Sequence, residues 1–451
     1  MRNSRLVTRA GLVTLNGPEQ PSPIGAEART VTTEAALQIV APAGATKSNH
    51  PHPAPPGNAL PPAADVAILR QRAQALLPRI AEGAAIRELQ RDLPYAFARE
   101  VANAGLLTFR IPKVYGGPGG TLRDAIRFVI ELAAVDSNLA QALRPNFGLV
   151  EGLLAAHDNE ADRKRWFGRL LAGHIIGNGG VERGGKQGAI QATIVRHGDH
   201  YLVNGTKYYS TGGLYADWVS SIALDEAGKE THFTVPRERA GMELVDDFDT
   251  IGQRLTASGT TRFTNMRVET DEVRGSFLPR DRRNPVSPVF QLFLAATEAG
   301  IARNALNDAV WFARNKARPI KHSSAERSVD DPYVQETIGQ ISAEVFAAEA
   351  ATLRAADTID AAWADNLSNA SLTQASIDVA QAQVFTVAAA LKASELALDV
   401  GGASSCDRQY NLDRHWRNAR TVANHNPRQW KAAAVGAWLL KDEPPPTTGL
   451  F

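Results

Sequence analysis

The order of hydrophobic patterns along the chain constrains the fold more than any other feature of the sequence. Apolar residues with helical spacing begin after Asp65, a candidate N-cap, and give way near His174 to β-branched and aromatic runs around Gly-Asp and Asn-Gly turns. Further helical segments are predicted around 94–106, 122–135, 138–156 and 160–172, and then, Ala-rich, at 288–317, 332–362 and 372–399, with a short one near 427–440. Helices, then strands, then helices is an order that argues against an alternating βαβ sheet.

This order predicts an α+β protein made of four segments. Residues 1–62 form a Pro/Ala-rich tail, which we expect to be disordered because its composition favours extended chain over a packed core. We predict an N-terminal helical domain at 63–173, a middle antiparallel β-barrel or sandwich domain at 174–280, and a C-terminal helical domain at 281–451.

Charge and cysteine content exclude several classes of protein. The 49 Lys+Arg nearly cancel the 48 Asp+Glu, so neither a nucleic-acid partner nor a polybasic membrane anchor is expected. No run approaches the ~18 apolar residues that span a bilayer. Cys406 is the single cysteine and is interpreted as a packed thiol, while His197 and His200 flank a turn, so no metal site is expected. We expect a cytoplasmic protein.

The usual nucleotide and hydrolase motifs are missing. The chain has no G-x-x-x-x-G-K-[ST], G-x-G-x-x-G, H-E-x-x-H or G-x-S-x-G. The Gly-rich stretch VYGGPGG (114–120) fits neither phosphate-binding spacing and is interpreted as a structural turn before a helix.

Two other segments are unusual in composition. NGTKYYSTGG (204–213) places hydroxyls, aromatic rings and two glycines after a hairpin turn, and RHWRNARTVANHNPRQWK (414–431) gathers arginines, histidines and tryptophans near the C-terminus. Taken singly, the first is also compatible with an ordinary strand end and the second with a solvated, capped helix.

Together with the order of the domains, these segments resemble the acyl-CoA dehydrogenases, and more closely their flavin-dependent monooxygenase branch, which includes dibenzothiophene monooxygenase and the sulfur-acquisition oxidoreductases. The resemblance covers about 66–440 and implies a C-terminal four-helix bundle after the β domain. The matching segments are VYGGPGG (114–120), IIGNGG (175–180), GDHYLVNGTKYYSTGG (198–213), IGQRLTASGT (251–260), ARPIKHSSAERSVDDPYV (317–334) and DRHWRNARTVANHNP (413–427).

The segment after the arginine-rich helix distinguishes the acyl-CoA dehydrogenases from the flavin-dependent monooxygenases. Many acyl-CoA dehydrogenases carry their carboxylate base there, but no Glu occurs between Glu395 and Glu443, and His425 and Asn426 take its place. The resemblance implies that His425 donates or holds a proton for a C4a-hydroperoxyflavin, which an imidazole that titrates near neutral pH can do. The alternative is that His425 caps the last helix at Pro427.

The resemblance also implies the other residues of the site. Asn178, Tyr209, Thr211, Gly212, Phe248 and Ser258 are expected at the flavin ring with His425, and Arg318 at the flavin phosphate, often across a subunit boundary. Asn178 and Thr211 are also expected to take part in catalysis. On the substrate side, Arg144 and Asn146 stand where relatives carry a histidine, and Phe248 stands where they carry a tryptophan.

The function implied is that of an FMN-dependent monooxygenase. Reduced FMN, from a separate NAD(P)H:flavin reductase, would activate O2 to oxygenate a small apolar substrate, with organosulfur compounds the expected class and aromatic or nitrogen-bearing ones open. FMN is expected rather than FAD, and a homo-oligomer, by resemblance a tetramer. The alternatives are an FAD-dependent acyl-CoA dehydrogenase with a base at a residue such as Glu298 or Glu395, and a flavin-free scaffold.

Overall fold

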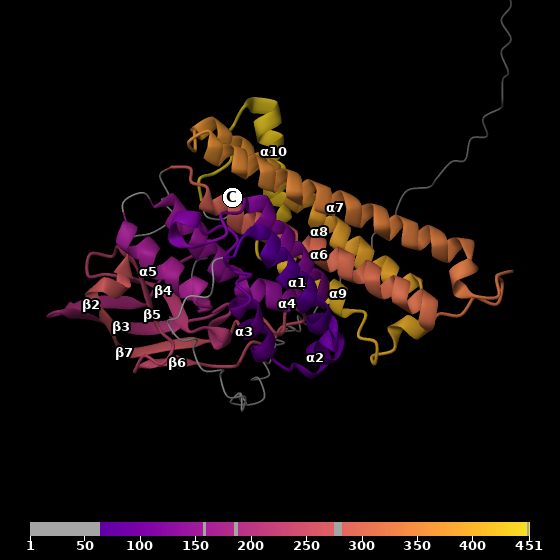
Figure 1. Ribbon diagram of the computed structural model, residues 1–451, viewed down its shortest axis with the longest axis horizontal. Helices are drawn as coiled ribbons and strands as arrows, with labels where there is room; N and C mark the ends of the chain where they lie inside the picture. The colour runs from indigo at the N-terminus through magenta and orange to yellow at the C-terminus, as the bar shows by residue number, and fades with distance from the viewer. Residues whose placement is uncertain (1–63, 157–158, 185–187, 275–281, 449–450) are drawn as a thin grey trace, which may run out of the picture. The chain divides into compact units, whose positions relative to one another are not determined.

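The computed structural model describes residues 64–156, 159–184, 188–274, 282–448 and 451. The tail predicted at 1–62 lies outside these residues. The described chain begins with helices, continues through one sheet and returns to helices, which is the predicted order. In Figure 1 the sheet lies on one side of the N-terminal helices and the long C-terminal helices cross on the other side.

Most of the N-terminal helices lie where hydrophobic periodicity predicts them, but the short helix α2 was not predicted. They are α1 (Val66–Ala81), α2 (Ala84–Gln90), α3 (Tyr95–Asn103), α4 (Leu122–Ala155) and α5 (Glu160–Leu171). Asp65 caps α1, because its carboxylate accepts the backbone N–H of Ile68 at 2.9 Å. The segments predicted at 122–135 and 138–156 are the two halves of α4, which bends at Asp136, where φ is −153° and ψ is 96°.

The strands form one sheet in the order β6-β7-β3-β2-β4-β5-β8, with β1 also paired to β4. They are β1 (Ile176–Gly179), β2 (Thr193–His197), β3 (His200–Lys207), β4 (Trp218–Leu224), β5 (Glu230–Pro236), β6 (Met242–Leu244), β7 (Thr261–Glu269) and β8 (Val273–Arg274). The sheet is mixed rather than wholly antiparallel, because β4 pairs in parallel with both β1 and β2. Turn spacing, on which the prediction rested, reports neighbours in sequence and cannot reveal these longer connections.

The C-terminal helices are α6 (Val286–Asn315), α7 (Pro332–Ala364), α8 (Asn369–Asp399), α9 (Arg414–Ala423) and α10 (Arg428–Lys441). The three long ones run beside one another in Figure 1, and α9 packs on α6 and α8 as a shorter fourth member of the bundle. Buried alanines along α6, α7 and α8 allow the close packing of these helices. The short helix predicted near 427–440 is α10.

Helix α4 is the element that joins the domains. It packs against α6 and α7 and also against β1, and it contributes to an apolar core shared with α1, α3, α6, α7 and α8. The loops that follow β3 and β6 close against the same helix through Tyr215, Leu255 and Ala257. The carboxyl-terminal half of α4 therefore lies where helices and sheet meet.

Three remaining sequence expectations can be compared with the described residues. Cys406 is exposed rather than packed, because it ends a short 3-10 turn (Gly402–Cys406) after α8. Within the described ranges, no helix is long and apolar enough to cross a membrane, and no cluster of His, Cys, Asp and Glu could hold a metal ion.

Candidate functional site

Two neighbouring cavities share one side chain, His425. The first, which we call the arginine cavity, has a volume of about 350 Å³ and is lined by residues that include Arg144, Asn178, Arg274, Phe290, His425 and Asn426. The second, which we call the hydroxyl cavity, has a volume of about 530 Å³ and is lined by residues that include Tyr209, Thr211, Phe248, Thr256, Ser258 and His425. Both volumes lie in the range of small-molecule sites.

One face of α4 contributes lining residues to both cavities. Gln141 lines the hydroxyl cavity, and Arg144, Pro145 and Gly148 line the arginine cavity, which is the spacing of one helical face. Pro145 has no N–H to donate to the carbonyl of Gln141, so one backbone hydrogen bond of the helix is missing beside the site. Gly148 lets the ring of Phe290 approach, because a Cβ there would lie 2.3 Å from Phe290 Cζ.

His425 is held in place from α4. It lies between α9 and α10, and the amide nitrogen of Gln141 lies 3.1 Å from its Nε2. The following residue, Asn426, donates from Nδ2 to Oε1 of Gln291 on α6 at 2.6 Å. Helix α10 begins after Pro427 without a side-chain cap. The helix-cap alternative for His425 is therefore not what the structure shows.

The charge state of His425 is set by its surroundings. Water can reach the ring through the two cavities, but the protein packed around it lowers its pKa to about 4, and the positive charge of Arg144 is the second cause. The imidazole is therefore neutral at neutral pH, which differs from the near-neutral titration expected from the sequence. A neutral imidazole has one nitrogen that donates a hydrogen bond and one that accepts.

The hydroxyl cavity gathers predicted residues from two loops. Oγ of Ser258 lies 2.8 Å from Oγ1 of Thr256 and 3.4 Å from Oγ1 of Thr211. The rings of Tyr209 and Phe248 meet edge to face, with their centroids 6.3 Å apart. A cavity lined by both hydroxyls and aromatic rings is suited to a flat ring with a polar edge.

Gly212 holds this loop against α4 without lining either cavity. Its φ is +72°, and a Cβ would lie 2.3 Å from the carbonyl oxygen of Ala142. Its N–H donates to the carbonyl of Thr256 at 3.0 Å. A residue without a side chain is thus required for the close approach of the loop to the helix.

Unsatisfied polar atoms in the hydroxyl cavity fit a flavin ring. Oε1 of Gln141 and Oε1 of Gln253 are both buried without a hydrogen-bond partner, and both residues line this cavity. Such acceptors suit a ring N–H, and the hydroxyls of Thr211 and Ser258 suit the carbonyl and nitrogen acceptors of the same ring. Among the described residues, no Lys or Arg lines this cavity, so a flavin phosphate would need a cation from elsewhere.

Three further predicted residues lie in different places. Asn178 lines the arginine cavity, and its N–H donates to the carbonyl of Thr211 at 3.0 Å, which ties the two cavities together. Asn146 lines neither cavity: it is 0% exposed, and its Oδ1 accepts the N–H of Ile176 at 2.9 Å, so it positions β1 on α4 instead of binding substrate. Arg318 is exposed in the loop after α6 and lines neither cavity.

Sequence reasoning missed several lining residues. Gln141 precedes Arg144 by three positions, so helical spacing could have identified it once Arg144 had been chosen. Gln253, Arg274 and Gln291 come from the loop after β6, from β8 and from α6, and no local pattern connects them with His425.

The carboxylates considered for an acyl-CoA dehydrogenase are not at the site. In the described part of the chain, no Asp or Glu lines either cavity. Glu298 on α6 is 0% exposed, both of its carboxylate oxygens have no hydrogen-bond partner, and burial raises its pKa well above the usual range. Glu395 is exposed on α8. Among the described residues, neither cavity therefore contains a carboxylate that could remove a proton next to a thioester.

Comparison with known families assigns both helical parts of the chain to domains of one family. Residues 66–174 match the model of the acyl-CoA dehydrogenase N-terminal domain, and residues 292–430 match that of the acyl-CoA dehydrogenase C-terminal domain. The chain belongs to the acyl-CoA dehydrogenase family. Within this family it belongs to the flavin-dependent monooxygenase branch, as the individual relatives show.

Three of these relatives are informative. The chain is 30% identical over 369 residues to dibenzothiophene monooxygenase of Rhodococcus erythropolis, an alignment that covers 76% of this chain and 86% of that protein. The crystal structure of FMN-bound TdsC from Paenibacillus sp. A11-2 matches with a TM-score of 0.78 at 26% identity, covering 84% of this chain and all of that one. Methanesulfinate monooxygenase MsuC from Pseudomonas fluorescens matches with a TM-score of 0.75 at 28% identity, covering 84% and 99%.

Proposed function

We propose that this protein is an FMN-dependent monooxygenase that uses reduced flavin and O2 to oxygenate a small organosulfur compound. The observation that supports this most directly is the place of His425, which lines both cavities, whereas no carboxylate of the described residues lines either one. The FMN-bound relative and the two relatives named for sulfur compounds agree with it. Reduced FMN, when bound, would supply the electrons that activate O2.

The residues divide by cavity. The hydroxyl cavity would hold the flavin ring, with the hydroxyls of Thr211 and Ser258 as its hydrogen-bonding partners and the rings of Tyr209 and Phe248 as its apolar contacts. The arginine cavity holds the substrate beside it, next to Asn178 and Arg144. His425, oriented by Gln141, presents a neutral imidazole between the two, where it holds a proton for the oxygen that is transferred.

The reduced cofactor comes from a separate flavin reductase. The chain has no G-x-G-x-x-G fingerprint for a nicotinamide dinucleotide, so its own reduction of FMN by NADH is not expected. Because no cation lines the hydroxyl cavity in the described residues, we propose that Arg318 of a second subunit pairs with the flavin phosphate in a homotetramer. The cytoplasmic location stays a prediction.

The test is a reconstitution with ¹⁸O2. The purified protein is incubated with FMN, NADH and an added flavin reductase, and dibenzothiophene or methanesulfinate is offered as substrate. We expect ¹⁸O in the product only when the reductase is present. Robust oxidation of NADH by the protein alone, or conversion of an acyl-CoA to its enoyl form with FAD, would contradict the proposal.

A further inference from the structure

Two arginines line the arginine cavity, and one of them, Arg144, has no carboxylate partner among the described residues. Arg144 from α4 and Arg274 from β8 both line it. Over the described ranges of the chain, no Asp or Glu lines this cavity. Charge of one sign in an enclosed site attracts ligands of the opposite sign.

Arg144 is the residue that most needs a partner. It is partly buried, it forms no hydrogen bond or ion pair with another described residue, and its Nε is buried without an acceptor. Burial lowers its pKa to about 10, so the guanidinium is still charged at neutral pH. Its guanidinium lies over the ring of Phe290, whose centroid is 5.7 Å from Cζ.

Another arginine of the same chain, Arg99, has the contacts expected of a buried arginine with a structural role. Arg99 is 8% exposed, and its two terminal nitrogens donate to the carboxylate of Asp217 at 2.7 and 2.9 Å. That pairing offsets the cost of removing a guanidinium from water. Arg144 has no such carboxylate, which indicates that a ligand supplies the missing charge.

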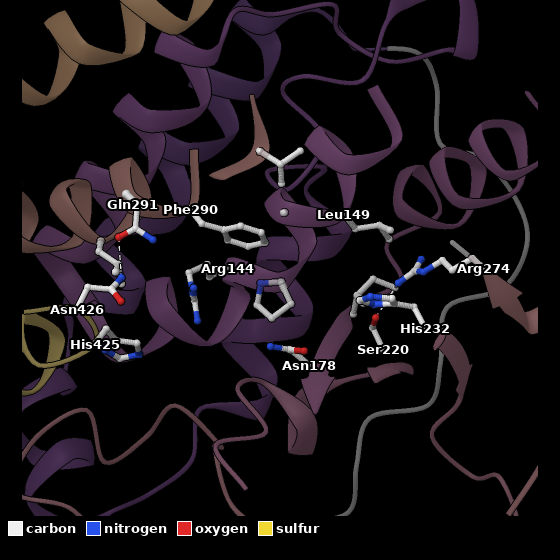
Figure 2. A pocket seen from close by; sticks show the side chains of 15 residues that line it. Arg144, Leu149, Asn178, Ser220, His232, Arg274, Phe290, Gln291, His425 and Asn426 are labelled. Carbon is white, nitrogen blue, oxygen red and sulfur yellow. Dashed lines mark hydrogen bonds between the residues drawn. The ribbon is translucent and has the colours of Figure 1, made fainter. Parts of the chain in front are cut away.

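The other walls of the cavity describe the rest of that ligand. Leu149, Ile176 and Phe290 offer apolar surface, and Asn178 offers an amide. Figure 2 shows Arg144 between His425 and Asn426 on one side and Asn178 on the other, with Arg274 farther along the cavity. The arrangement suits a charged head at Arg144 and a short apolar body beyond it.

We infer that the arginine cavity binds a small organic oxyanion, a sulfinate, sulfonate or carboxylate on a short apolar body, whose charged head pairs with Arg144. The planar fork of a guanidinium matches two oxygens of such a group. The inference rests on the proposed function, because it names the substrate class of the same site. A neutral aromatic sulfide would leave the charge of Arg144 without a partner.

Binding at Arg144 has a consequence for His425. The charge of Arg144 is one cause of the low pKa of His425, so an anion that offsets this charge raises that pKa. Among the described residues, the other titratable groups that line the cavity are His232 and Arg274. The substrate's own charge thus makes His425 a better holder of a proton.

The test compares ligands of the same shape and different charge. Benzenesulfinate, benzenesulfonate and benzoate are titrated by calorimetry into the full-length protein with oxidised FMN, beside the neutral methyl phenyl sulfone. We expect the best anion to bind at least about 10-fold more tightly than the sulfone, in line with a hydrogen bond to a charged group. The ranking of the three anions identifies which oxyanion fits. Equal affinity for the sulfone and every anion would overturn the inference, and this comparison needs no variant.

Variants assign the effect to Arg144. Arg144→Gln should weaken anion binding by about 10-fold or more and change sulfone binding much less, while Arg144→Lys should keep part of the preference. Arg314→Gln, which removes an exposed charge on α6, is the matched control and should bind the anions like the parent. Equal losses for anion and sulfone in Arg144→Gln would show a structural role and sink the assignment.

The histidine provides a readout that a structural role would not move. The ring resonances of His425, assigned with His425→Phe, should titrate at higher pH when benzenesulfinate is bound and also in Arg144→Gln. No shift in either case would contradict the pairing. These measurements use oxidised FMN and need no turnover, so they separate the two proposals. Oxygenation of neutral compounds without anion binding would refute the inference alone. Anion binding without oxygenation would refute the proposed function alone.

Discussion

His425 illustrates at the scale of one residue how position and environment combine. Its ring lines both cavities, and the amide of Gln141 fixes it from α4. The protein packed around the ring and the charge of Arg144 lower its pKa to about 4. We therefore expect His425 to act by hydrogen bonding while neutral, and to become a stronger base when the charge of Arg144 is offset. Its role therefore depends on what occupies the arginine cavity.

Removing this imidazole should uncouple oxygen consumption from product formation. We expect His425→Phe, which keeps a ring and loses both nitrogens, to lower substrate oxygenation by roughly 10²–10⁴-fold, the usual share of a general acid or base. FMN affinity should change little, because other residues line the hydroxyl cavity. Product and H2O2 are quantified together, and H2O2 should rise as product falls. His322→Phe, at an exposed histidine, is the control; an unchanged product yield in His425→Phe would refute the role.

Element boundaries near the site were predictable from local pattern, but the contacts between elements were not. The N-cap of α1 at Asp65 and the break in α4 near Asp136 follow from capping and hydrophobic periodicity, which operate within a few residues. Strand β1 in IIGNGG was missed, because a short strand with two glycines has no alternation and exists through its parallel pairing with β4.

The candidate site shows the same division. Resemblance identified Thr211, Ser258 and His425, and the structure places all three at the hydroxyl cavity. It could not identify Gln253 or Gln291, since their approach depends on how α6 and the loop after β6 pack on α4. The sequence placed Asn146 near the site but gave it the wrong role, because its amide oxygen accepts the backbone N–H of Ile176 in β1.

Asn146 offers a test of the junction between α4 and β1. Asn146→Ala should lower the free energy of unfolding by about 1–3 kcal/mol, because the buried N–H of Ile176 loses its acceptor. A fall in Tm by differential scanning fluorimetry checks this. Glu395→Ala, at an exposed position on α8, should leave Tm nearly unchanged. A variant of Asn146 with native Tm and lost anion binding would instead return this residue to the substrate site.

Glu298 in the middle of α6 should make stability fall as pH rises. Burial raises the pKa of its carboxyl well above the usual range although Arg420 and Arg428 act in the opposite sense. Above the ordinary pKa of a glutamate, the folded protein keeps a proton that the unfolded chain has lost, so stability decreases with pH through this window. Glu298→Gln stays uncharged, and its Tm should exceed that of the parent at about pH 8 and approach it near pH 4.5. A Tm difference independent of pH would contradict this, and Glu395→Gln is the exposed control.

At the scale of the whole molecule, the question is which cation pairs with the phosphate of FMN. The described residues place no cation on the hydroxyl cavity, and Arg318 lies exposed in the loop after α6, lining neither cavity of its own chain. A closed homo-oligomer can bring such a loop to the site of a neighbouring subunit. We therefore expect the flavin site to be complete only in an oligomer.

Complementation between two variants tests this sharing of a site. Arg318→Ala should weaken FMN binding by roughly 1.5–3 kcal/mol and riboflavin binding much less, because riboflavin lacks the phosphate. At an FMN concentration too low for that variant, mixing its subunits with those of His425→Phe should restore oxygenation: the Arg318→Ala subunit keeps His425 and receives Arg318 from its partner. Equal and random pairing predicts about a quarter of native activity, since half of the pairs are mixed and one site in each is intact.

Each variant reassembled alone is the control. If the mixture remains as inactive as its components while size-exclusion chromatography with differently tagged subunits shows that hybrids have formed, Arg318 acts within its own chain and the flavin site is not shared.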